Sequence, residues 1–166
     1  MSLSPPDVCG ARSVRQLCRR SGGTLVAVPR PRDFDWTAAV LREISRDDGG
    51  VAVVALPHCH WCDGSMVDLE AVGAACRRRG IPLVCDITQS AGVVPFSVEK
   101  VRPAVVACSV HKWLHGIYGC SLLYAAPGFL DFTGTDAAHI ATLEHFERQL
   151  AGISWTVNSH PETLHF

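Results

Sequence analysis

The sequence predicts an α/β fold in which a mostly parallel sheet is flanked by helices. Short apolar runs rich in β-branched residues alternate with segments whose apolar residues recur at helical spacing. This alternation favours parallel strands, because a parallel pair needs a long crossover that a helix usually provides. The chain has 166 residues, of which 48% are hydrophobic, so we expect one domain with a buried core.

Three segments in the first half of the chain carry the helical pattern. The first has apolar residues at helical spacing over residues 14–18 and ends at a pair of glycines. The second begins after Asp35, a residue type that is favoured as a helix N-cap. The third is expected to begin at Ser65, whose spacing to Asp68 is that of a capping box. It ends at the arginines of residues 77–79, which suit the negative end of the helix dipole and which we interpret as a solvated helix end.

Four apolar runs are predicted to be strands: residues 51–56, 82–86, 104–109 and 120–125. Their near-continuous apolar character is typical of strands that are buried on both faces, as in parallel sheets. Further along the chain, residues 136–150 have the pattern of one amphipathic helix.

The composition argues against several classes of partner. Fifteen basic and sixteen acidic residues give a net charge of −1, which provides no electrostatic reason to expect nucleic acid or an anionic membrane. No apolar run approaches the roughly 20 residues of a membrane-spanning helix, and the first residues lack the pattern of a secretory signal. Several of the eight cysteines lie inside apolar runs, where cysteine acts as a small hydrophobe. We therefore expect a protein of the reducing cytoplasm.

Reactive side chains follow three of the predicted strands, within residues 58–63, 86–90 and 109–113. In an open α/β sheet, ligands bind outside the carboxyl ends of the strands. Asp86 ends an apolar strand, where an acid has no packing role. Its carboxylate could hold a protonated ring nitrogen of a cofactor, or it could cap a helix or a turn. Gln89 could donate to a phenolate oxygen or be a loop amide.

Lys112 is the most informative single residue. It is one of only two lysines, with Lys100, and it follows directly on a predicted buried strand. A lysine that is desolvated in such a place can have a lowered pKa and can form a Schiff base. The alternative interpretation is a surface lysine on a loop.

The alternating residues His58, His60, Cys62 and Asp63 resemble metal ligands, since side chains two apart share one face of a strand. Zinc sites usually need a second half with matching spacing, and none follows. We therefore expect no metal. No glycine-rich phosphate loop of the nucleotide-binding kind occurs either.

These residues together resemble the class V aminotransferase family, which consists of fold-type I pyridoxal-phosphate enzymes. The resemblance rests on three motifs along the chain: Asp86-x-x-Gln89-Ser-x-Gly92, Ser109-x-His111-Lys112-Trp113 and Gly116-x-x-Gly119. The stretch from His60 to Gly64 is similar to the loop that precedes the cofactor aspartate of the family. Family members include cysteine desulfurases, kynureninases and isopenicillin N epimerase-like enzymes.

The resemblance implies a role for each motif residue. Lys112 would form the Schiff base with pyridoxal phosphate and later shuttle protons. Asp86 would pair with the pyridinium nitrogen, and Gln89 would hydrogen-bond the ring hydroxyl. Three further side chains would approach the cofactor, two of them at its phosphate and a tryptophan near it: Ser109, His111 and Trp61.

The resemblance covers residues 12–150 and implies the central part of an incomplete large domain. The family's phosphate-binding glycine loop and its small domain lie outside the match. Residues 151–166 are expected to be a divergent or loose tail, and Ile117 replaces the proline or alanine that is common in the family.

We expect an enzyme that acts on an amino-acid substrate through pyridoxal phosphate. Epimerase- or lyase-like chemistry is favoured over desulfuration, because none of the cysteines is placed to be a mobile nucleophile. The resemblance also implies a homodimer. The alternative is a truncated, inactive family fragment or isoform that at most binds the cofactor or a full-length partner.

Overall fold

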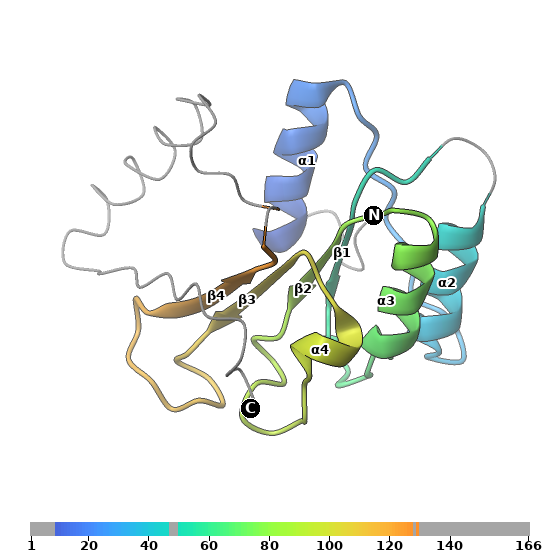
Figure 1. Cartoon of the computed structure of the whole chain (residues 1–166). Coiled ribbons are helices and arrows are strands. Elements are labelled where there is room, and N and C mark those ends of the chain that lie inside the picture. Colours follow the sequence, from blue (N-terminus) through green and yellow to red (C-terminus); the bar gives the residue numbers. More distant parts are fainter. Residues whose placement is uncertain (1–8, 47–49, 128, 130–166) are drawn as a thin grey trace.

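The computed structural model describes residues 9–46, 50–127 and 129, which form a four-stranded sheet with helices packed around it (Figure 1). The sheet order follows the chain, β1-β2-β3-β4. β1, β2 and β3 run parallel, and β4 is antiparallel to β3, which confirms a mostly parallel sheet. In chain order the strands are β1 (Val54–Pro57), β2 (Leu83–Asp86), β3 (Val105–Ser109) and β4 (Ser121–Ala125).

Four helices occur in this part of the chain: α1 (Cys9–Ser21), α2 (Trp36–Ser45), α3 (Leu69–Arg78) and the short α4 (Val98–Val101). Figure 1 shows α2 and α3 side by side, with α4 beside α3, while α1 stands apart from this group.

The two predicted helix starts behave differently. Asp35 caps α2 as expected, since its side chain accepts a hydrogen bond from the backbone N–H of Ala38 at 2.8 Å.

The predicted start of α3 at Ser65 is wrong by one turn. Asp68 is the N-cap, and its carboxylate accepts from the N–H of Ala71 at 2.9 Å. Ser65 is instead held in the preceding loop, where its N–H donates to Asp63 and an isolated bridge pairs Cys59 with Met66. This loop uses the residues that a longer helix would need.

The arginines at the end of α3 are exposed, as expected of a solvated helix end, and two of them also bond to neighbouring carbonyls. The guanidinium of Arg77 donates to the carbonyl of Val101 at 2.7 Å. The guanidinium of Arg79 donates to the carbonyls of Ile44 and Arg46, at the end of α2. Two of the three arginines therefore link α3 to its neighbours, because long side chains can reach carbonyls that a helix end leaves without partners.

The core lies between the helices and the sheet. Buried residues of α2 recur at four-residue intervals and those of α3 at intervals of three and four, as helical spacing requires. Each large apolar side chain that leaves water contributes about 1.5–3 kcal/mol to folding. The core members of α2, α3, β1 and β2 include Trp36, Val40, Ile44, Leu69, Val72, Cys76, Val54, Leu56, Leu83 and Cys85.

Each strand begins one to three residues later than predicted, whereas β2, β3 and β4 end at the predicted residues. β1 begins at Val54, later than the apolar run that starts at Val51, because its partner strand begins at Leu83 and the register pairs these two residues. Within the described residues, no helix is long and apolar enough to cross a membrane. The predicted helix over 136–150 and the predicted tail over 151–166 lie outside the described residues.

Candidate functional site at the carboxyl edge of the sheet

The carboxyl ends of three parallel strands meet at one edge of the sheet. The register aligns Pro57 of β1 with Asp86 of β2, and Asp86 with Ala107 of β3. Ladder bonds continue past the strand ends, from the N–H of His58 to the carbonyl of Asp86 and from the N–H of Ile87 to the carbonyl of Ala107, each at 2.9 Å. The three segments that the sequence singled out therefore leave the sheet side by side.

A tight turn after β2 presents Asp86 at this edge. The side chain of Asp86 is exposed, and its Oδ1 accepts a hydrogen bond from the N–H of Thr88 at 2.9 Å. Gln89 follows on the same turn and is half-buried. Asp86 therefore shapes its own turn, as one of the alternatives from sequence required, while its carboxylate still faces solvent, where a ligand can reach it.

Thr88 ties this turn to the next strand. Its Oγ1 accepts a hydrogen bond from the backbone N–H of Ser109, the last residue of β3, at 3.0 Å. Sequence reasoning did not select Thr88. The available signal was its position between Asp86 and Gln89, since a hydroxyl inside a turn can bond a neighbouring backbone.

Lys112 lies in the loop that follows β3. Its carbonyl accepts from the N–H of His115 at 3.1 Å, and the N–H of Gly116 closes the loop on the carbonyl of Val110 at 2.9 Å. The ring of His111 stacks on Tyr118 with 4.4 Å between centroids. The side chain of Lys112 is exposed, so the expected desolvation of its ammonium group is not provided by the described residues.

Gly92 brings the turn after β2 against the lysine loop. Its φ is +89°, and a Cβ at this position would lie 2.9 Å from the carbonyl oxygen of Trp113 and 3.1 Å from Leu114 Cδ2. Only a residue without a side chain allows this approach. The turn that carries Asp86 and the loop that carries Lys112 are therefore in direct contact.

The other lysine lies elsewhere. Lys100 belongs to α4, which precedes β3 and so adjoins the amino end of that strand. Its ammonium group is 3.8 Å from the carboxylate of Glu70, and both side chains are largely exposed. Of the two lysines, only Lys112 is at the carboxyl edge.

The loop after β1 holds its histidines in separate contacts. His58 Nδ1 lies 2.8 Å from Ser90 Oγ, whereas His60 Nδ1 lies 3.1 Å from Asp63 Oδ1 and its ring stacks on Trp36. Burial by itself would raise the pKa of Asp63. Hydrogen bonds from Ser65 and the electrostatic attraction of His60 and Arg30 outweigh this effect, so the pKa of Asp63 is lowered.

Among the residues that the structure describes, no three His, Cys, Asp or Glu side chains are grouped as metal ligands. Trp61, on the same loop, is 54% exposed, which leaves its ring free to contact a ligand or another surface. The structure places this loop beside the Asp86 turn, which it contacts through the His58–Ser90 pair.

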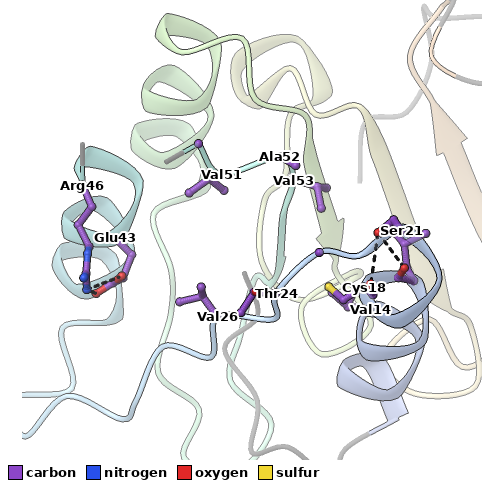
Figure 2. A pocket seen from close by; sticks show the side chains of 13 residues that line it. Val14, Cys18, Ser21, Thr24, Val26, Glu43, Arg46, Val51, Ala52 and Val53 are labelled. Atoms are coloured by element: carbon purple, nitrogen blue, oxygen red, sulfur yellow. Dashed lines mark hydrogen bonds and ion pairs between the residues drawn. The ribbon is translucent and has the colours of Figure 1, made fainter. Parts of the chain in front are cut away.

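A cavity of about 610 Å³ lies away from this edge (Figure 2). It is lined by α1 residues such as Val14 and Cys18, by Thr24 and Val26, and by residues 50–53, which lead into the amino end of β1. None of the candidate cofactor residues lines it. The reactive side chains instead gather at the opposite end of the strands.

The donor set at the carboxyl edge fits pyridoxal phosphate. Asp86 offers a carboxylate to a cationic ring nitrogen, Gln89 an amide to a phenolic oxygen, and Lys112 a primary amine to an aldehyde. The contact at Gly92 holds the acid and the amine on neighbouring segments. An α/β sheet with this edge has the architecture of the fold-type I pyridoxal-phosphate enzymes.

Comparison with known proteins defines the family. Residues 9–150 match the model of the class V aminotransferases, and the chain belongs to this family. It is 25% identical over 129 residues to a 2-aminoethylphosphonate–pyruvate transaminase of Cupriavidus necator, covering 78% of this chain and 34% of the relative. It is 32% identical over 114 residues to the cysteine desulfurase IscS of Pseudomonas putida, covering 69% of this chain and 27% of the relative.

Solved structures agree. The apo cysteine desulfurase of Thermococcus onnurineus NA1 has a TM-score of 0.65 at 23% identity, covering 78% of this chain and 32% of that one. The cystine C-S lyase C-DES, solved with cysteine persulfide, also has a TM-score of 0.65 at 25% identity, covering 78% and 35%. Pyridoxal phosphate is the cofactor of this family, and a C-DES variant carries glycine covalently linked to it. The chain spans about a quarter to a third of the length of these relatives.

Proposed function

We propose that this chain binds pyridoxal phosphate at the carboxyl edge of β1, β2 and β3 and serves an epimerase- or lyase-like reaction on an amino-acid substrate. The observation that carries the proposal is the contact between the turn that bears Asp86 and the loop that bears Lys112, made at Gly92. A carboxylate and an amine on adjoining segments would suit the cationic ring nitrogen and the aldehyde of one planar cofactor.

Each side chain has a distinct task in this proposal. The Lys112 amine would hold the cofactor through its aldehyde carbon, with loss of water, and, once displaced by the substrate amine, would move a proton at the substrate α-carbon. The Asp86 carboxylate keeps the ring nitrogen protonated, and Gln89 donates to the ring hydroxyl. When bound, the cofactor supplies an electron sink for negative charge at the α-carbon. Ser109 and His111 are assigned to the phosphate, and Trp61 to the neighbourhood of the ring.

The relatives favour no single reaction. They include a transaminase, a cysteine desulfurase and a C-S lyase, and the lyase is the one that matches the chemistry proposed here. Desulfuration would require a mobile nucleophilic thiol, whereas the one cysteine within residues 110–120, Cys120, is only partly exposed and directly precedes β4. A cytoplasmic location and a homodimer complete the proposal.

The test is covalent trapping. The purified chain is incubated with pyridoxal phosphate, the visible absorption band is recorded, and borohydride reduction is followed by peptide mapping. We expect the reduced adduct on Lys112, lost in Lys112→Ala and retained in Lys100→Ala. Adduct on Lys100, or no adduct in the wild-type chain, would refute the proposal.

A second candidate function is that of a non-catalytic partner for a full-length relative. It is favoured by the exposed apolar side chains of the lysine loop, where Ile117 is 73% and Tyr118 82% exposed. Activity of a full-length relative is measured with and without the chain. A change that Ile117→Ser abolishes supports this role, whereas turnover by the chain alone excludes it.

A further inference from the structure

His58 is a buried histidine that no step of the proposed function uses. It follows β1 directly, is 8% exposed, and its Nδ1 lies 2.8 Å from the Oγ of Ser90, which is fully buried. The hydroxyl of Ser90 also lies 3.3 Å from the carbonyl of Ile87. The 2.8 Å separation of Nδ1 and Oγ is that of a strong hydrogen bond between the two side chains.

The surroundings keep the ring of His58 neutral and in place. Burial lowers the pKa of His58, and the carboxylate of Asp68 opposes this shift only in part. Its ring also meets the ring of Phe96 edge-on, with 5.9 Å between centroids. The backbone N–H of His58 donates to the carbonyl of Asp86, and its carbonyl accepts from Val67. His58 is thus held rigidly at the end of β1 and is hydrogen-bonded to Ser90.

The His58–Ser90 bond is one of two side-chain anchors on the turn after β2. Ser90 is held towards β1 by His58, and Thr88 is held towards β3 by Ser109. Gln89 lies between these two anchored residues. Ser90 is tied to the end of β1 and Thr88 to the end of β3, on opposite sides of β2. The backbone of Gln89 between them therefore has little freedom to rotate.

We propose that His58 is a positioning residue that acts through Ser90 to hold Gln89 in the orientation that meets the cofactor ring hydroxyl. The inference rests on the proposed function, since it assigns a device to the same site. His58 itself touches no cofactor in this scheme. Its effect is to remove alternative orientations of the turn before the cofactor arrives, so that less ordering is required on binding.

The experiment measures cofactor affinity and the pH midpoint of the visible band in the full chain. We expect His58→Leu and Ser90→Ala each to weaken pyridoxal phosphate binding about five- to tenfold, and the double variant no more than either alone. Both shift the pH midpoint in the same direction as Gln89→Ala. His58→Asn stays near the wild-type affinity, because its side-chain amide can hydrogen-bond to Ser90 as a donor or as an acceptor.

Two comparisons separate positioning from general destabilisation. Val72→Ala, in the buried face of α3, lowers stability without touching the turn, and we expect it to leave the pH midpoint unchanged. In a Gln89→Ala background, His58→Leu should add no further loss of affinity. An equal loss in that background, or an unchanged midpoint in His58→Leu, overturns the inference. A wild-type chain without a Lys112 adduct instead overturns the proposed function.

Discussion

Replacing Gly92 by alanine tests the contact on which the candidate site depends. The new Cβ would lie 2.9 Å from the carbonyl oxygen of Trp113, and the backbone at φ +89° is one that residues with a side chain rarely adopt. The conformational cost is about 1–2 kcal/mol. Displacing a packed backbone adds about 1–3 kcal/mol. We therefore expect Gly92→Ala to lower the free energy of unfolding by about 2–5 kcal/mol.

Gly80→Ala is the matched control. Gly80 has a φ of +66°, but a Cβ there meets nothing within 4 Å, so only the conformational cost of about 1–2 kcal/mol applies. Denaturant unfolding monitored by circular dichroism gives both values. Gly92→Ala should also weaken pyridoxal phosphate binding, because the lysine loop must move, whereas Gly80→Ala should not. Equal destabilisation by the two variants with unchanged cofactor binding refutes the reasoning.

Three further predictions concern the scaffold. Arg79→Ala should lower the free energy of unfolding by about 1–2 kcal/mol because two carbonyls at the end of α2 lose their donor, whereas exposed Arg78→Ala should change it little. Asp35→Ala should cost about 1 kcal/mol by removing the cap of α2, and Asp35→Asn should restore most of it, both measured by denaturant unfolding. Burial raises the pKa of the Cys85 thiol to about 12, so an alkylating reagent at pH 8 should label exposed Cys62 first, as peptide mapping checks. Because the folded-state pKa of Cys85 is the higher one, its contribution to stability is complete below pH 9 and is lost as the pH rises towards 12. A stability that stays flat over this range contradicts the assignment.

The fold was predictable to a large extent because local patterns and sheet topology agree. Apolar runs marked all four strands, and the N-cap at Asp35 marked the start of α2. The start of α3 was missed because the capping pattern at Ser65 competes with a loop that is closed by the Cys59–Met66 bridge. Hydrogen bonds between residues that are distant along the chain decide whether such a segment becomes helix or loop. The spacing of residues within one segment does not show which bonds will form.

The candidate site was predictable as a set of residue types. An acid, an amide and a lysine after consecutive parallel strands must meet at one edge, since parallel strands end on the same side. The environment of Lys112 was not predictable: the sequence places it beside a buried strand, and the structure exposes it. Burial depends on what packs over the loop, which no local pattern specifies.

The amino-acid sequence by itself determined the class of fold, the family and the identity of the groups at the carboxyl edge, because hydrophobic period and motif spacing are written along the chain. Tertiary structure alone decided which neighbours those groups have. The clamp of Ser90 by His58 spans 32 positions, and that of Ser109 by Thr88 spans 21. Such bonds form only when the sheet register sets the strand ends side by side, and their geometry follows from that register.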